Sequence, residues 1–262
     1  MNSVNKTLYI PLYGKSLVSQ KAIILDDKKA EEIWSKVNFP LRGKAKSKWL
    51  AYYMGMRAAV FDQWLKSKMQ TKENYTVLHL GCGLDSRVER VQTNQMPWYD
   101  VDFKEVVEER RKYYQESNFY HILEGDLTSE DWLEQIPKTN AAIVVLEGVS
   151  MYLTNEELTQ LFIRLKERFN RVAILLDCYT TFAAKMSKFK NPVNTVGVTN
   201  VYGIENAKFL EKNTGFSFIQ EHEITPQAFI NQLQGIEKII FKRLYAGNFS
   251  KKLYKLYEYH SK

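Results

Sequence analysis

A pair of glycines closes an apolar run in the first half of the chain. Residues 76–82 end on Gly81-Cys82, and Gly83 then leads into the helical pattern of residues 84–91. The first glycine permits a tight turn, and the second lets the backbone approach a ligand without a Cβ clash. The following helix N-terminus offers unpaired N–H groups. The pattern predicts a ligand on this loop, although a turn that serves packing alone would use the same glycines.

The residue three positions after the second glycine narrows the choice of ligand. Dinucleotide sites place a third glycine there, where a pyrophosphate needs room. In this chain the position is Ser86. This substitution disfavours a nicotinamide dinucleotide and leaves S-adenosylmethionine (SAM), a nucleoside without phosphate.

Carboxylates follow the second and third predicted strands. Asp102 ends the string Trp98-Tyr99-Asp100-Val101-Asp102, at the edge of the sheet where ligands bind. It can accept both ribose hydroxyls of an adenosine, or instead cap the next helix. Asp126 can accept the adenine amino group while Leu127 donates its backbone N–H to the ring. For Asp126 a cap or turn is the alternative.

Two further charges lie among apolar residues. Glu147 follows the fourth predicted strand, where a carboxylate is poorly solvated unless it faces a cation such as the SAM ammonium. Arg57 lies within the apolar stripe of a helix over 48–68 and needs an anion, such as the carboxylate of SAM. An internal ion pair or a snorkelling side chain is the alternative for Arg57, and a local cap is the alternative for Glu147.

These residues require a sheet that brings the strand ends together. From residue 71, short apolar runs alternate with amphipathic helices, which is typical of a mostly parallel sheet. The predicted strands are 76–82, 98–102, 120–124, 141–146, 171–178, 216–222 and 238–245. The predicted helices are 84–91, 104–115, 129–135, 155–169, 205–213 and 226–234. The close pair of strands at the end predicts an antiparallel last strand.

The first seventy residues show no strand pattern. We therefore expect two parts, an N-terminal helical cover over 1–70 and an α/β core over 71–262. The polar stretch 180–203 is expected to add to the cover as an insertion, because long loops inside compact domains are usually functional or mobile.

Five strings in order resemble the leucine carboxyl methyltransferase superfamily, and in size its short bacterial branch of polyketide-type O-methyltransferases. They are Arg57-Ala58-Ala59-Val60-Phe61-Asp62, Gly81-Cys82-Gly83-Leu84-Asp85-Ser86-Arg87, Tyr99-Asp100-Val101-Asp102, Gly125-Asp126-Leu127, and Glu147-Gly148 with Met151-Tyr152-Leu153. The resemblance implies a Rossmann-like class I methyltransferase fold of seven strands with SAM as cofactor. It also implies Arg57 on the SAM carboxylate, Gly81 and Gly83 under the methionine part, and Glu147 near the amino-acid end. Asp102 would then hold the ribose, with Asp126 and Leu127 at the adenine.

The expected reaction is in-line methyl transfer to a carboxylate or hydroxyl oxygen of a small molecule. A carboxylate needs no general base, whereas a hydroxyl does. None of His79, His121, His222 and His260 is an obvious base, which favours an acidic, anionic acceptor. The sequence identifies no catalytic residue and no oligomeric state.

Composition sets the remaining limits. Apolar residues make up 45% of the chain and charged residues 26%, which excludes a disordered protein. The two cysteines form neither a disulfide framework nor a metal pair, and no metal site is expected. We find no membrane span and no apolar leader, so a cytoplasmic enzyme is expected.

Charge is uneven along the chain and leaves alternatives open. Residues 1–70 carry 13 basic against 5 acidic side chains, and residues 242–262 carry 6 against 1. Such ends are typical of solvated surface, or they face an anionic substrate, nucleic acid or lipid headgroups. A nucleic-acid methyltransferase is disfavoured because no Asn/Asp-Pro-Pro-aromatic string follows the fourth strand. A SAM-binding protein without catalysis is the other alternative.

Overall fold

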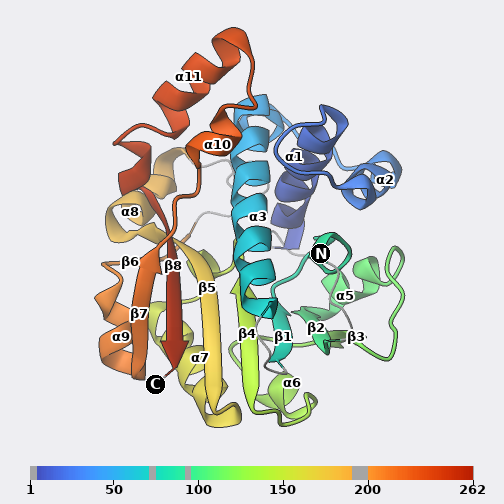
Figure 1. Ribbon diagram of the computed structural model, residues 1–262, viewed down its shortest axis with the longest axis vertical. Coiled ribbons are helices and arrows are strands. Elements are labelled where there is room, and N and C mark those ends of the chain that lie inside the picture. Colours follow the sequence, from blue (N-terminus) through green and yellow to red (C-terminus); the bar gives the residue numbers. More distant parts are fainter. Residues whose placement is uncertain (1–4, 71–74, 92–95, 191–199, 262) are drawn as a thin grey trace.

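A computed structural model describes residues 5–70, 75–91, 96–190 and 200–261 of the chain. Its centre is one sheet with the order β3-β2-β1-β4-β5-β8-β7, and a short β6 pairs with β5 (Figure 1). The strands are β1 (Tyr75–Leu80), β2 (Trp98–Asp102), β3 (Tyr120–Glu124), β4 (Ala141–Leu146), β5 (Arg171–Thr180), β6 (Gly203–Ile204), β7 (Phe216–Glu221) and β8 (Tyr254–Ser261). All neighbours pair in parallel except β8, which is antiparallel to both β5 and β7. The predicted Rossmann-like class I architecture is confirmed.

The sheet is buried on both faces, which explains its continuous apolar strands. In β4 every residue is buried. Because successive side chains alternate between faces, Ile143 packs into one core with the N-terminal helices, while Val144 packs into a second core with α7. The carboxyl ends of the parallel strands therefore meet at one edge, where the candidate residues follow them.

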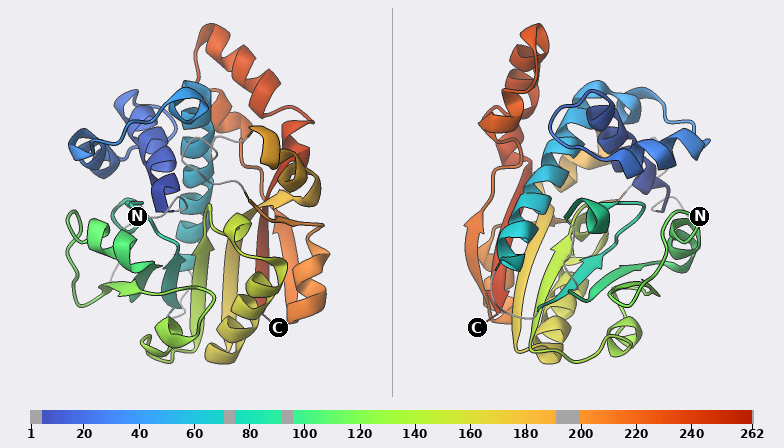
Figure 2. Two further views of the ribbon diagram at one scale, coloured as in Figure 1. Left: turned by 180° about the vertical axis from the view of Figure 1, so that it is seen from behind. Right: turned by 45° about the vertical axis from the view of Figure 1, so that its right-hand side comes forward.

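Helices cover both faces of the sheet (Figures 1 and 2). The N-terminal ones are η1 (Asn5–Leu8), α1 (Tyr9–Gln20), α2 (Lys28–Lys36), η2 (Gly43–Lys46) and α3 (Lys48–Met69). The others are α4 (Arg87–Val91), α5 (Lys104–Arg110), α6 (Asp131–Glu134), η3 (Ser150–Tyr152), α7 (Asn155–Arg168), α8 (Thr181–Lys190), α9 (Lys208–Thr214), α10 (Gln227–Ile230), α11 (Gly235–Tyr245) and η5 (Ser250–Lys252). Thr154 caps α7 in a capping box with Glu157.

The end of the chain differs from the sequence prediction. Residues 238–245, predicted as the last strand, lie in helix α11, and the antiparallel last strand is β8. The apolar residues of this stretch also fit helical spacing, since Phe241 and Tyr245 stack one turn apart. In β8 the run Leu256–Tyr259 is buried without alternation because both faces of the sheet are covered there: Leu256 packs into one core, and Tyr257 and Tyr259 pack into the other.

The predicted polar stretch 180–203 is helical in its first half, where α8 follows β5 directly. Residues 191–199 of the stretch lie outside the described residues. In the part of the chain that the structure covers, no helix is long and apolar enough to cross a bilayer.

Candidate active site

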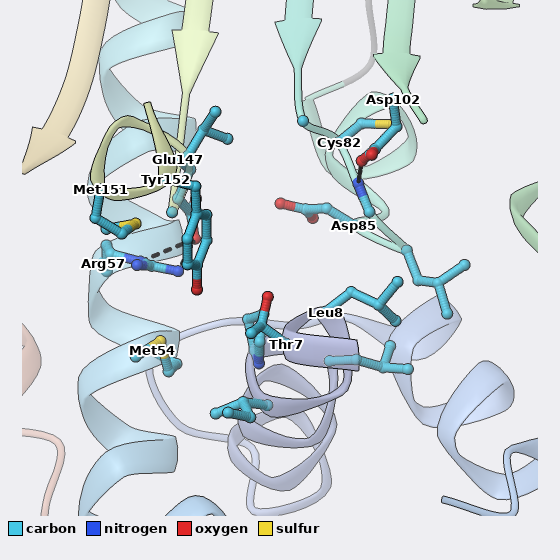
Figure 3. A pocket seen from close by; sticks show the side chains of 18 of the residues that line it. Thr7, Leu8, Met54, Arg57, Cys82, Asp85, Asp102, Glu147, Met151 and Tyr152 are labelled. Carbon is cyan, nitrogen blue, oxygen red and sulfur yellow. Dashed lines mark hydrogen bonds and ion pairs between the residues drawn. The ribbon is translucent and has the colours of Figure 1, made fainter. Parts of the chain in front are cut away.

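A large cavity of about 690 Å³ lies where the parallel strands end, against η1, α1 and α3. Figure 3 shows Arg57, Glu147, Met151 and Tyr152 on one side of it, with Cys82, Asp85 and Asp102 on the other. Its lining includes all seven residues that the sequence analysis singled out: Arg57, Gly81, Gly83, Asp102, Asp126, Leu127 and Glu147. The structure thus brings the candidates together, and the ligand atom that each binds remains a prediction.

The glycine loop after β1 forms a cradle at the floor of the cavity. Gly81 and Gly83 have φ of +65° and +53°, a left-handed conformation that glycine adopts without strain. A Cβ on Gly81 would lie 2.3 Å from Cγ2 of Val149, in the loop after β4. The two loops therefore pack against each other so closely that a side chain at residue 81 would collide with Val149.

Asp102 holds this loop in shape. Its Oδ2 accepts a hydrogen bond from the N–H of Gly83 at 2.7 Å, and its Oδ1 accepts one from the N–H of Phe103 at 2.8 Å. The helix-cap alternative is not seen, because Phe103 occupies the N-cap of α5. Burial raises the pKa of Asp102 to about 6, against the lowering effect of the two N–H groups.

Asp126 and Leu127 lie after β3. The exposed Asp126 accepts hydrogen bonds from the backbone N–H and the hydroxyl of Thr128, at 2.9 and 2.8 Å. Asp126 thus makes the turn that the sequence analysis gave as its alternative role. Leu127 is buried, and its carbonyl oxygen accepts from the Arg164 guanidinium.

Arg57 is paired within the protein. Its Nε donates to Oε1 of Glu147 at 3.1 Å, and one Nη donates to Oδ2 of Asp177 at 2.8 Å and to the Tyr254 hydroxyl at 3.1 Å. The internal ion pair that the sequence left open is therefore present. The guanidinium still lines the cavity.

Glu147 bridges Arg57 to Arg87, to which it also hydrogen-bonds. Burial raises the pKa of a carboxyl, but Arg87 and Arg57 together lower that of Glu147 to about 2. For Asp177, which is fully buried, burial outweighs the attraction of Arg57 and raises the pKa. Of the two carboxyl groups that pair with Arg57, Glu147 thus has a lowered pKa and Asp177 a raised one.

Sequence reasoning missed Asp177 and Tyr254. Asp177 lies near the end of β5 and accepts from the Gly148 N–H at 2.7 Å and the Tyr254 hydroxyl at 2.7 Å. The argument that identified Glu147, a carboxylate at the end of an apolar strand, applies equally to Asp177. Tyr254 gave no such signal because the sequence pattern of β8 does not indicate a strand.

The residue that replaced the third glycine has a structural role. Ser86 donates from its hydroxyl to Oδ1 of Asp27 at 2.5 Å, and Arg90 donates to Oδ2 of Asp27 at 2.7 Å. Lys15 pairs with Asp85 at 3.0 Å. These buried contacts join the N-terminal helices to the glycine loop and to the start of α4.

The histidines offer little base chemistry. His79 lines the cavity, but its Nδ1 is 2.9 Å from Oδ1 of Asp100 and its Nε2 is 3.2 Å from Arg87. Burial lowers its pKa. His222 and His260 both contact Glu258 instead. Among the described residues no group of three or more His, Cys, Asp or Glu side chains is placed to hold a metal.

A family model described as leucine carboxyl methyltransferase matches residues 4–166, more than half of the chain. The chain belongs to the leucine carboxyl methyltransferase family. It is therefore a SAM-dependent methyltransferase, and the family resemblance drawn from the five strings is confirmed.

Known proteins agree with this assignment. The tetracenomycin polyketide synthesis O-methyltransferase TcmP of Streptomyces glaucescens is 28% identical over 244 residues, which cover 91% of this methyltransferase and 89% of TcmP. The SAM-dependent methyltransferase dpfgK of Gibberella zeae is 25% identical over 186 residues, 64% of this chain and 62% of its own. The crystal structure of the magnesium protoporphyrin IX methyltransferase ChlM from Synechocystis has a TM-score of 0.55 at 14% identity, covering 95% of this chain and all of the other. This last likeness concerns the fold alone.

Proposed function

We propose that this methyltransferase methylates an acidic oxygen of an apolar small molecule, with the carboxylate as the first choice. The observation that carries the proposal is the lining of the cavity, which passes from the glycine loop to a wall of aromatic and thioether side chains. That wall includes Tyr53, Met54, Met151, Tyr179 and Tyr254. Such a wall suits a flat, apolar acceptor.

The residues present fit SAM. The glycine loop lines the cavity, and Asp102 presents carboxylate oxygens at the strand edge. The Arg57 guanidinium also lines the cavity and would meet the SAM carboxylate by exchanging part of its pairing with Glu147 and Asp177. When bound, SAM supplies an electrophilic methyl group and a positive charge that favours an acceptor anion. The protein's own part is to orient the two molecules in line and to exclude water.

The cavity lining supports an acceptor that carries little charge besides its reacting oxygen. Of the lysine and arginine side chains, Lys15 and Arg57 line it, and both are paired with carboxylates. A second anionic group on the acceptor would find no free counter-charge among the described lining residues. Because the His79 ring is held on both nitrogens, a nucleophile that is already ionised fits better than an alcohol.

We further infer that residues 1–70 act as a cover, because Thr7, Leu8 and Lys15 line the cavity from η1 and α1. The region 71–262 would then be the core that holds SAM. For the proposed insertion 180–203, Tyr179 just before it lines the cavity, whereas residues 191–199 lie outside the described part.

The stability of the transferred methyl group toward alkali tests the proposed acceptor. The enzyme is incubated with methyl-labelled SAM and a small-molecule extract of its source cells, and the products are treated with mild alkali. A methyl ester releases the label as volatile methanol, whereas an ether retains it. We expect release. Alkali-stable ether products would move the assignment to a hydroxyl acceptor, and label on nitrogen or on nucleic acid would overturn the proposal.

Asp102 predicts how SAM binding depends on pH. If the ionised carboxylate accepts the ribose hydroxyls, protonation weakens binding, so the Kd for SAM should rise as the pH falls through about 6. Asp102→Asn should weaken SAM binding at pH 8 by about 1–3 kcal/mol and flatten the dependence between pH 5 and 7. Calorimetric titration at several pH values measures both. An identical pH profile in the variant would show that Asp102 does not bind SAM.

A further inference from the structure

Helix α11 presents an apolar and basic face to solvent. Ile236 is 72% exposed and Ile239 is 67% exposed, values far above those of packed side chains. Lys242 and Arg243 are exposed on the same side of the helix. We call Ile236, Ile239, Lys242 and Arg243 the α11 surface. Figures 1 and 2 show α11 standing out from the body of the molecule at one end.

The opposite face of α11 attaches the helix to the protein. Phe241 is fully buried and lies 6.3 Å from the ring of Tyr52 in α3, centroid to centroid. Glu237 accepts hydrogen bonds from Lys48 at 2.7 Å and from the Tyr52 hydroxyl at 2.6 Å. These contacts fix which face points outward, so the exposure of the isoleucines follows from how the helix is packed.

The charge around the α11 surface has one sign. Residues 235–255 carry six lysine and arginine residues and one acidic residue, Glu237, which is already paired with α3. For Lys238, Lys242, Arg243 and Lys252 we find no ion pair with the described part of the chain. The segment therefore combines protruding apolar side chains with uncompensated positive charge.

Exposed apolar side chains continue from the α11 surface into neighbouring segments near the cavity. Leu244 and Phe249, which follow the α11 surface in the chain, are 59% and 61% exposed. Leu244 also lines the cavity, together with Tyr245 and Ser250. Helix α8, which carries the exposed Phe182 and Met186, lies beside η5 (Figures 1 and 2). The hydroxyl of Thr180, the residue just before α8, donates a hydrogen bond to the carbonyl of Lys252 in η5.

We propose that the α11 surface binds this methyltransferase to an anionic lipid surface. A helix with apolar residues flanked by lysine and arginine lies in the interface of such a bilayer, with its apolar side chains among the headgroups. A second copy of the chain is a poorer occupant, because a symmetric contact would bring two unpaired positive clusters together.

Vesicle sedimentation tests this proposal and needs no knowledge of the acceptor. The full-length protein is mixed with phosphatidylcholine vesicles, with or without phosphatidylglycerol at about a third of the lipid, at low and at high salt. We expect binding to the anionic vesicles only, weakening as salt rises. Lys242→Glu with Arg243→Glu should lower the affinity at least about tenfold, and Ile236→Asp with Ile239→Asp should lower it comparably.

Matched controls use exposed residues far from α11. Lys208→Glu with Lys212→Glu makes the same charge change on α9, and Ile219→Asp makes one such replacement of an exposed isoleucine on β7, to be compared with Ile236→Asp alone. Both should bind vesicles within about twofold of the wild type, and circular dichroism confirms that all variants are folded. Equal loss in the controls would overturn the proposal, as would no sedimentation of the wild type at low salt. The proposal would also be overturned if the α11 variants changed only the oligomeric mass of the protein, or only its binding to another protein, and left vesicle binding unchanged. SAM affinity, measured in parallel, reports separately on the proposed function.

Discussion

Replacing Arg57 with alanine is expected to lower the free energy of unfolding of the ligand-free protein by about 3–5 kcal/mol. The reason is that Arg57 pairs with Glu147 and Asp177, which are both buried. Glu147 would keep Arg87, but Asp177 would retain only neutral donors, the Gly148 N–H and the Tyr254 hydroxyl. If Arg57 had no partner in the ligand-free protein, it would be a costly cation whose removal would hardly destabilise the fold. The two carboxylates reverse that expectation.

Urea unfolding measures this effect, and the double variant Arg57→Ala with Asp177→Asn tests its cause. Neutralising Asp177 should recover a part of the lost stability, because the buried charge left behind is then absent. The control Arg243→Ala removes an exposed guanidinium and should change the stability by less than about 0.5 kcal/mol. A loss below about 1 kcal/mol for Arg57→Ala, or no coupling to Asp177, would contradict this explanation.

The same variant tests the predicted contact with the SAM carboxylate. If Arg57 binds that group, wild type should prefer SAM over decarboxylated SAM, and Arg57→Ala should lose most of the preference. Arg57→Lys should restore little, because an ammonium cannot form the bidentate contact. Binding measured by calorimetry under conditions where the variant is folded separates this effect from stability.

The sequence predicts the sheet well where strands are short, apolar and followed by helices. The predicted bounds of β2, β3 and β4 coincide with the structure. Helix ends are predicted less accurately, since α5 ends at Arg110 and not at residue 115. The last strand was misplaced because helix α11 has several apolar residues close together, while β8 is rich in tyrosine and charged residues. Backbone pairing with β5 and β7, which no local pattern reports, decides that β8 is a strand.

The site was predictable in its positions but only partly in its contacts. All seven candidates line one cavity because each lies at or just after the end of a strand, or on the helix packed against the strand ends. Their partners come from segments far apart in the chain, as with Asp177 and Tyr254 around Arg57. Ser86 shows the same limit. Its departure from the dinucleotide pattern is visible in the sequence, but its hydrogen bond to Asp27 depends on how α2 packs.

Gly81→Ala is expected to cost about 2–5 kcal/mol of stability and to abolish tight SAM binding. The left-handed conformation at φ +65° costs an alanine about 1–2 kcal/mol. The new methyl group would also meet Cγ2 of Val149 at 2.3 Å, and such overpacking costs about 1–3 kcal/mol. Relief of this contact must shift the loop after β4, which also carries Glu147 and Gly148 at the cavity.

Two further variants separate the two causes. Gly43→Ala makes the same change at φ +55° with no heavy atom within 4 Å of the new Cβ, so it should cost about 1–2 kcal/mol and leave SAM binding unchanged. Val149→Ala removes the clashing methyl groups, and the Cβ that remains at residue 149 lies 3.5 Å from where the Cβ of an alanine at residue 81 would stand, an ordinary contact. Adding Val149→Ala to Gly81→Ala should therefore restore SAM binding in large part, as measured by calorimetry, while the conformational cost remains in urea unfolding. If the double variant binds SAM no better than Gly81→Ala alone, the requirement for glycine arises from the ligand's own approach to the backbone rather than from the packing of the two loops.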